Sequence, residues 1–148
     1  MMTNNQIKTH KYWNILIVDD IKNLHKITKN AFFEEEVLKK EINFLSAYDE
    51  EEAINLLDKY NKEIALIILD MVMLNGNGGI KVLKHLTEDL KNNITQVILR
   101  TGYPGREQVK NININYPQVV ILEKGETDVD LLIRLVTEAI EKYNNKLV

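Results

Sequence analysis

Residues 64–73, with the sequence IALIILDMVM, constrain the fold of this chain more than any other stretch. The first six residues are all apolar, and an aspartate, Asp70, follows them directly. An apolar run of this length between polar flanks is typical of a strand that is buried on both faces of a parallel sheet. Because ligands bind at the carboxyl ends of strands in such sheets, Asp70 is a candidate site residue.

Further apolar runs alternate with segments of helical periodicity. The other runs predicted as strands are 14–18, 42–48, 94–99 and 118–122. We expect the first helix, which begins near Ile21, to continue through the acidic run 34–36 toward Lys40. This alternation predicts βαβ units with right-handed crossovers. The fold class is therefore α/β, with a doubly wound, five-stranded parallel sheet in a three-layer α/β/α sandwich.

Composition narrows the function classes. The 148 residues are 45% apolar and 28% charged, which suits one globular domain. A net charge of −3 with no basic cluster argues against nucleic acid as a partner. No apolar stretch approaches the roughly 20 residues needed to cross a bilayer, and no signal-peptide pattern is present, so we expect a cytoplasmic protein. We also expect a flexible N-terminal arm over 1–12 and one domain over 13–148.

Polar and charged residues stand at the ends of the predicted strands. Asp19 and Asp20 follow the first strand, Asp70 ends the third, Thr101 ends the fourth, and Lys124 comes shortly after the fifth. In a parallel sheet these ends open on one edge, so the residues converge. Close carboxylates raise each other's pKa unless a cation neutralises them, and Mg²⁺ with oxygen ligands is the natural cation. A lysine and a hydroxyl beside that cation point to phosphoryl chemistry with an aspartate nucleophile.

The same residues carry a resemblance to the bacterial two-component response-regulator receiver domain, the CheY-like family. The sequence ILIVDD at 15–20, Asp70, Thr101-Gly102 and Lys124 stand in the order and spacing of that family. The sequences IALIILDMVM and ILRTGYPG are most similar to receivers that precede HD-GYP-type output domains. No such output domain lies within these 148 residues, so its hydrolase activity is not carried over. The resemblance implies the flavodoxin-like strand order 2-1-3-4-5.

The resemblance assigns a role to each acidic residue. It implies that Asp70 accepts a phosphoryl group from the phosphohistidine of a histidine kinase or phosphotransfer protein. It further implies a bound Mg²⁺, with Asp20 as a direct ligand and Asp19 as a ligand mainly through water. Asp70 itself and the backbone carbonyl of Val72 would complete the protein ligands.

The resemblance also implies a conformational switch. Lys124 would pair with the phosphoryl oxygens, and the Thr101 hydroxyl would turn inward to bond the aspartyl phosphate. The new conformation would act on a downstream protein partner, without independent enzymatic turnover. A homodimer through the last two helices and the fifth strand is a further hypothesis. The residues that would form ion pairs in it are Arg106, Glu107, Lys110, Asp130 and Arg134.

Departures from the family pattern keep alternatives open. Gly125 follows Lys124 where the family usually has a proline in cis, and we expect a trans peptide because a non-proline cis bond costs about 3–4 kcal/mol. Ile121 stands where the family often has an aromatic ring. Both changes favour an alternative function, a receiver-like interaction module that works without phosphorylation. A third alternative is a small metal-dependent phosphatase-like enzyme, although the chain lacks a D-x-D pattern at Asp70.

The residues two positions beyond Asp70 and Thr101 bear on how long a phosphoryl group would last. They are Val72 and Tyr103. Neither an isopropyl group nor a phenol readily activates water at neutral pH. We therefore expect a long-lived phosphorylated state.

Overall fold

The structure is a computed structural model that describes residues 5–8, 11–73, 78–102, 110–112, 115–125 and 128–147. Its strands are β1 (Tyr12–Val18), β2 (Glu36–Val37), β3 (Lys40–Ala47), β4 (Leu66–Asp70), β5 (Gln96–Thr101) and β6 (Val119–Glu123). Its helices are α1 (Lys22–Ala31), α2 (Glu50–Tyr60), α3 (Gly78–Lys84) and α5 (Val129–Leu147). A 3₁₀ turn, η1 (Asn61–Glu63), follows α2, and a π-helical turn, η2 (His85–Asp89), extends α3. None of these described helices has the length and apolar character that a membrane crossing requires.

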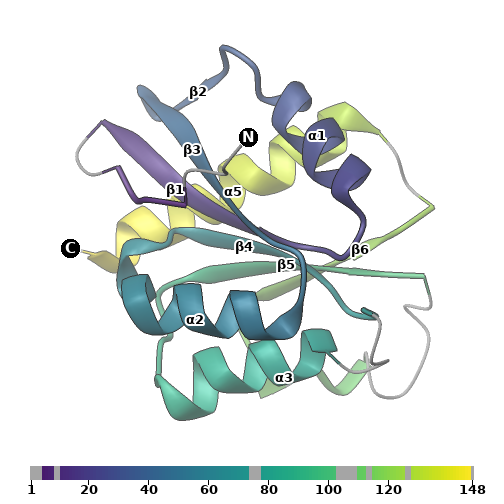
Figure 1. Cartoon of the computed structure of the whole chain (residues 1–148). Helices are drawn as coiled ribbons and strands as arrows, with labels where there is room; N and C mark the ends of the chain where they lie inside the picture. The colour runs from purple at the N-terminus through teal and green to yellow at the C-terminus, as the bar shows by residue number, and fades with distance from the viewer. Residues whose placement is uncertain are drawn as a thin grey trace.

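The strands form one six-stranded sheet in the order β2-β3-β1-β4-β5-β6 (Figure 1). The five longer strands are parallel, and numbered among themselves they run 2-1-3-4-5. The prediction of a five-stranded, wholly parallel sheet is wrong in one respect. The short strand β2 pairs antiparallel with β3, with Glu36 opposite Glu41 and Val37 opposite Lys40.

The additional strand arises where the first helix was expected to continue. Helix α1 ends at Ala31, and Glu34 has a φ of 61°, which is incompatible with a continuing helix. Leu38 and Lys39, with φ of 48° and 65°, form the two-residue turn that reverses the chain into β3. Such turns usually contain glycine or asparagine, so the sequence carried no signal for this hairpin.

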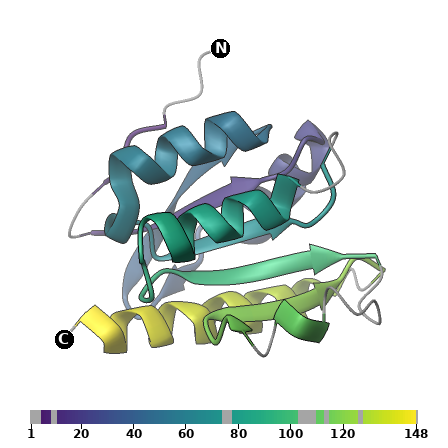
Figure 2. The same cartoon turned by 90° about the horizontal axis from the view of Figure 1, so that it is seen from below.

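Helices cover both faces of the sheet, as the three-layer prediction required (Figures 1 and 2). Helices α2 and α3 pack on one core cluster, and α5 packs on the other. Strand β4 lies between the two clusters, with Ile67 and Leu69 in the first and Leu66 and Ile68 in the second. All five residues of β4 are buried. The apolar run before Asp70 is therefore the central strand of the sheet.

Residues 5–8 lie against the sheet. The side-chain amide of Asn5 donates to the Ser46 carbonyl at 3.0 Å and accepts from the Ser46 N–H at 2.9 Å. The N–H of Lys8 donates to Oδ1 of Asn14 at 2.9 Å. Residues 1–4 and 9–10 lie outside the described part, so the division into an arm over 1–12 and a domain over 13–148 stays a prediction.

Candidate acidic site at the carboxyl edge of the sheet

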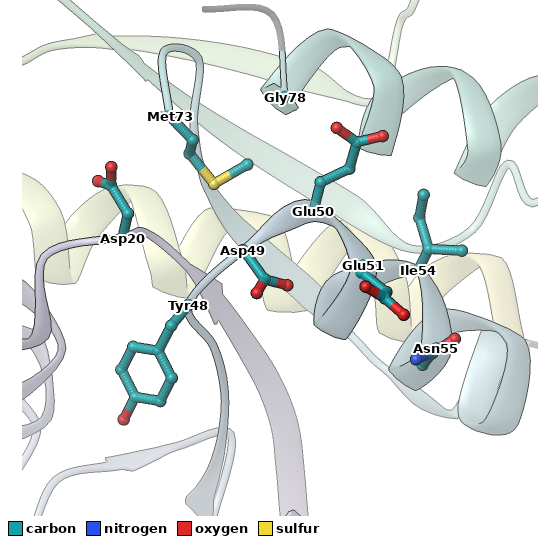
Figure 3. Close-up of a pocket in the computed structure, with 9 residues that line it drawn as sticks. All are labelled: Asp20, Tyr48, Asp49, Glu50, Glu51, Ile54, Asn55, Met73 and Gly78. Carbon is teal, nitrogen blue, oxygen red and sulfur yellow. The ribbon is translucent and has the colours of Figure 1, made fainter. Parts of the chain in front are cut away.

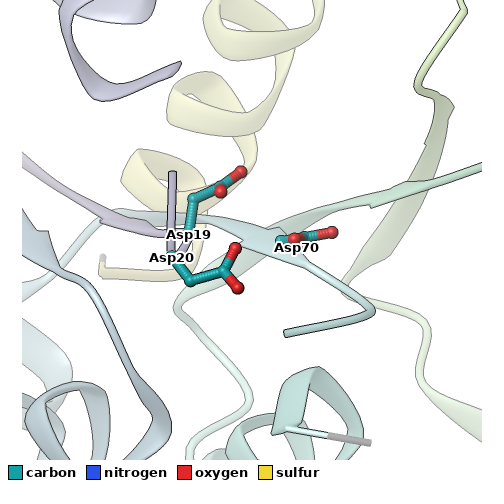
Figure 4. A group of neighbouring side chains, drawn as sticks. All are labelled: Asp19, Asp20 and Asp70. Atoms are coloured by element: carbon teal, nitrogen blue, oxygen red, sulfur yellow. The ribbon is translucent and has the colours of Figure 1, made fainter. Parts of the chain in front are cut away.

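Three aspartates meet where β1 and β4 end (Figure 4). Asp19 and Asp20 follow β1 directly, and Asp70 is the last residue of β4. One carboxylate oxygen from each lies within 4.8 Å of the others. Asp19 and Asp70 are each only 2% exposed, whereas Asp20 is half-buried. The sequence placed these three residues at one edge, and the structure brings them together.

The pKa of Asp19 reflects the crowding of negative charge in the cluster. Burial raises the pKa of the Asp19 carboxyl, and the nearby Asp70 and Asp20 raise it further. The N–H of Ile21, which donates to Asp19 Oδ1 at 2.9 Å, and the guanidinium of Arg100 act in the opposite direction. Crowded carboxylates of this kind are stabilised by a cation, and their oxygens are the hard ligands that suit Mg²⁺. The residues present therefore fit a divalent hard cation.

Lys124 reaches the cluster from β6. Its Nζ lies 2.5 Å from Oδ1 of Asp70, and the N–H of Val72 donates to the same oxygen at 3.3 Å. The backbone N–H of Lys124 donates to the carbonyl of Thr101 at 2.8 Å, so the end of β5 positions the lysine. The described chain contains no cis peptide bond, which confirms the trans peptide expected between Lys124 and Gly125.

Thr101 completes the predicted set of site residues. Thr101 is the last residue of β5 and is 2% exposed. Ile121, in the place where the family often has an aromatic ring, is half-buried and packs against the core. Tyr103, Arg106 and Glu107 lie outside the described residues, so the hypotheses about them stay predictions.

A second cation at the site, Arg100, was missed from the sequence. Arg100 stands opposite Asp70 in the register of β4 and β5. Its Nη1 lies 3.2 Å from Oδ2 of Asp19, and the two side chains are 20% and 3% exposed. The available signal was a charged residue immediately before Thr101, at the end of a buried strand. The cluster thus combines three carboxylates with a guanidinium and an ammonium.

The start of α3 holds the backbone that carries Asp70. The N–H of Gly79 donates to the carbonyl of Met71 at 3.3 Å. A Cβ at Gly79 would lie 2.4 Å from the carbonyl oxygen of Asp70 and 2.7 Å from Cα of Met71. Only glycine permits this close approach of helix to strand.

His25 supports the cluster from α1 rather than offering a ligand to it. Its Nε2 lies 2.8 Å from the carbonyl oxygen of Asp19, and its Nδ1 lies 3.0 Å from Oγ of Ser46. Burial lowers the pKa of His25 and favours the neutral ring. Because a carbonyl only accepts, Nε2 donates to Asp19 and Nδ1 of the neutral ring accepts from the Ser46 hydroxyl. The ring therefore fixes the backbone at the end of β1.

A cavity of about 530 Å³ opens beside the cluster, between Asp20 and the start of α2 (Figure 3). It leaves Asp20 open to solvent, whereas Asp19 and Asp70 are enclosed. A hydrated cation therefore has access from this side. The acidic residues that line the cavity are Asp20, Asp49, Glu50 and Glu51.

Comparison with known proteins finds a relative that is similar to this chain over only part of its own length. No protein-family model matches the chain. The 3'3'-cGAMP-specific phosphodiesterase 2 of Vibrio cholerae serotype O1 is 26% identical over 133 residues, which is 90% of this chain and 25% of that protein. The chain therefore spans about a quarter of the length of this relative.

Solved structures share the whole fold. The signal receiver domain of an HD domain-containing protein from Pseudomonas fluorescens Pf-5 superposes with a TM-score of 0.70 at 20% identity, covering 96% of each chain. This chain has the fold of a response-regulator receiver domain. A chain of the CheX-CheY-BeF₃-Mg²⁺ complex from Borrelia burgdorferi matches with a TM-score of 0.66 at 24% identity, covering 85% of this chain and 87% of that one.

The receiver resemblance predicted from the motifs is confirmed, and one of these neighbours belongs, as predicted, to an HD domain-containing protein. Within the receiver fold the predicted site residues gather at the carboxyl edge of the sheet. They are Asp19, Asp20, Asp70, Thr101 and Lys124, joined there by Arg100.

Proposed function

We propose that this chain is a phosphoacceptor receiver domain of a two-component phosphorelay. Asp70 would accept a phosphoryl group from the phosphohistidine of a histidine kinase or phosphotransfer protein, and the phosphorylated state would signal to a protein partner. One observation carries this proposal. Asp70 is a buried carboxylate that meets Lys124 at 2.5 Å and shares its surroundings with two further aspartates.

The site residues divide into metal ligands and phosphoryl ligands. Asp20, Asp19, Asp70 and the backbone carbonyl of Val72 would hold Mg²⁺, which when bound supplies positive charge to the oxygens of the transferring group. The CheX-CheY-BeF₃-Mg²⁺ complex from Borrelia burgdorferi supports this for the same fold. The cavity beside Asp20 provides the entrance.

In the transfer, a carboxylate oxygen of Asp70 attacks the phosphorus. An O–P bond forms as the N–P bond of the phosphohistidine breaks, and the departing imidazole nitrogen keeps the electron pair and takes up a proton. The Lys124 ammonium lies close enough to follow the negative charge onto the phosphoryl oxygens. The Thr101 hydroxyl would donate a hydrogen bond to one of them. The Thr101 carbonyl accepts from the Lys124 N–H, so a shift of the backbone at one residue would be felt at the other.

A Mg²⁺-dependent phosphorylation assay tests the proposal. Wild type treated with acetyl phosphate should gain the mass of one phosphoryl group, and chelation of Mg²⁺ should prevent this. Asp70→Asn should gain nothing, whereas Asp58→Asn, the same change at an exposed carboxylate on α2, should behave as wild type. A folded wild type that stays unmodified would contradict the proposal.

A receiver-like interaction module that works without phosphorylation is the second candidate. The aliphatic side chain of Ile121 and the trans peptide after Lys124 favour it, because both differ from the usual receiver. The same assay separates the two candidates. The proposal includes no phosphodiesterase activity, because the similarity to that relative covers only a quarter of it. Dimerisation through the last two helices and the fifth strand, which is β6 here, stays a prediction, with Asp130 and Arg134 exposed on α5.

A further inference from the structure

Arg100 places a permanent positive charge inside the acidic cluster. Its Nη1 lies 3.2 Å from Oδ2 of Asp19, whose side chain is only 3% exposed. Arginine is the basic side chain best suited to a buried ion pair, because its planar guanidinium presents several N–H donors in a fixed arrangement. The proposed function assigns the same carboxylate to a divalent cation. Two cations, the guanidinium of Arg100 and the proposed divalent ion, would therefore compete for the Asp19 carboxylate.

The sheet topology explains how Arg100 makes this contact. Arg100 belongs to β5 and Asp19 follows β1, with β4 between them. Adjacent strands are about 4.8 Å apart, so the side chain must span roughly two strand spacings. The register that aligns Arg100 with Asp70 directs it across the end of β4. An arginine has the length to do this.

Each of the two basic residues forms an ion pair with a different buried aspartate. Lys124 pairs with Asp70, and Arg100 pairs with Asp19. Asp20 stands on the open side, against the cavity. In the resting protein the enclosed carboxylates are thus each matched by a cation of the chain itself.

We propose that Arg100 is an internal counter-cation that competes with the divalent ion for Asp19 and thereby lowers the metal affinity of the resting site. The inference rests on the proposed function, because it takes Asp19 to be a metal ligand. A divalent ion bound at Asp19, directly or through water, must displace the guanidinium or share the carboxylate with it. Either arrangement weakens binding, since displacement breaks an ion pair and sharing brings two cations together.

Metal affinity of the unphosphorylated protein measures this competition directly. Isothermal titration calorimetry with Mg²⁺, or electron paramagnetic resonance with Mn²⁺, gives the affinity without any phosphoryl transfer. Arg100→Gln should bind the ion roughly tenfold tighter or more, because a neighbouring cation changes the affinity of a carboxylate for a competing proton by at least that factor. Lys142→Gln, which removes an exposed positive charge from α5, should bind as wild type does.

A double-mutant cycle locates the effect at Asp19. In an Asp19→Asn background, Arg100→Gln should no longer tighten binding, because the contested carboxylate is gone. Circular dichroism and thermal unfolding check that each variant is folded. If Arg100→Gln fails to fold, Arg100→Met carries the test, since methionine keeps an unbranched side chain but removes the charge. Tighter binding by Arg100→Met than by wild type then supports the competition, and equal or weaker binding overturns it.

The remaining outcomes separate this inference from the proposed function. Equal or weaker binding by a folded Arg100→Gln overturns the competition and leaves the phosphoacceptor proposal in place. Failure of both wild type and Arg100→Gln to bind a divalent ion overturns the metal site and the inference together. Binding by Arg100→Gln but not by wild type also supports the inference, because Arg100 would then prevent metal binding to the resting site altogether.

Discussion

Nζ of Lys124 lies 2.5 Å from Oδ1 of Asp70, although the two residues belong to the ends of strands that are not adjacent in the sheet. The aspartate side chain is 2% exposed and the lysine side chain is 34% exposed. The lysine therefore approaches the buried carboxylate from the solvent side. Under the proposed function, its ammonium would shift toward the incoming phosphoryl group from this exposed side.

We expect Lys124→Met to slow phosphorylation of Asp70 in protein that remains folded. Loss of a preorganised cation at the transferring group lowers the rate by roughly 10²-fold or more. Because the carboxylate of the pair is buried, the free energy of unfolding should also fall, by up to about 3 kcal/mol, the lower end of the range for breaking a buried ion pair. Initial rates with acetyl phosphate and Mg²⁺, followed by intact mass, measure the first effect. Lys142→Met is the matched control, and a wild-type rate in Lys124→Met would contradict the assigned role.

Gly79→Ala should destabilise the domain by about 1–3 kcal/mol, the range for overpacking in a closely packed region. The added Cβ would lie 2.4 Å from the Asp70 carbonyl oxygen and 2.8 Å from that of Met71, and neither backbone atom can move aside cheaply. Urea unfolding followed by circular dichroism measures the change. Gly102→Ala is the control, because a Cβ there meets nothing within 4 Å. Equal stabilities of the two variants would show that α3 is free to shift away from β4.

The strand ends were predictable from the sequence because two simple regularities coincide. Apolar runs end at polar residues, and parallel strands bring those ends to one edge. Asp19, Asp70 and Thr101 follow directly from this reasoning. The position of Lys124 was harder to predict, because this residue lies beyond the end of its strand. A hydrogen bond from its backbone N–H to the Thr101 carbonyl holds it at the site.

The missed features depend on geometry that spacing does not encode. Arg100 reaches Asp19 across an intervening strand, which requires the register of three strands and the reach of one side chain. Strand β2 has only two residues, and its turn contains Leu38 and Lys39 in the left-handed region instead of glycine or asparagine. No periodicity detects so short an element.

His85 should make stability depend on pH near neutrality. Its Nε2 lies 2.6 Å from Oδ1 of Asp58 on α2, and its Nδ1 lies 2.9 Å from Oδ2 of Asp89 on its own turn. Burial alone would lower the pKa of His85, but the hydrogen bonds and charges of the two aspartates outweigh it and raise the pKa. A raised pKa stabilises the fold below the unfolded value of about 6.5, and the contribution is lost as pH rises through the folded value.

The measurement is the free energy of unfolding by urea across that pH window, for wild type and His85→Gln. The difference between them should fall as pH rises, by up to about 1 kcal/mol, because both carboxylates are largely exposed. The pKa of His25 is lowered, so its contribution to stability changes with pH in the opposite direction. Because both proteins contain His25, taking the difference between them removes this contribution. A difference that stays constant with pH would mean that the two aspartates do not hold the imidazolium.

The phosphorylated state of Asp70 should persist for minutes or longer. Val72 donates its N–H to Oδ1 of Asp70, the proposed acceptor, at 3.3 Å, and the residue is 45% exposed. An isopropyl group can neither orient an attacking water nor remove its proton, whereas general base catalysis typically accelerates such a step by about 10²–10⁴-fold. The other position named from the sequence, Tyr103, lies outside the described residues.

Decay is measured by removing the phosphodonor, keeping Mg²⁺, and following the phosphorylated mass over time. Val72→Asn introduces an amide that can orient water without acting as a base, so we expect the lifetime to shorten by roughly tenfold, below the range for a full general base. Val129→Asn is the matched control, since Val129 is a similarly exposed valine at the start of α5. A wild-type lifetime of seconds would count against the argument, because water would then reach the phosphoryl group without help from residue 72.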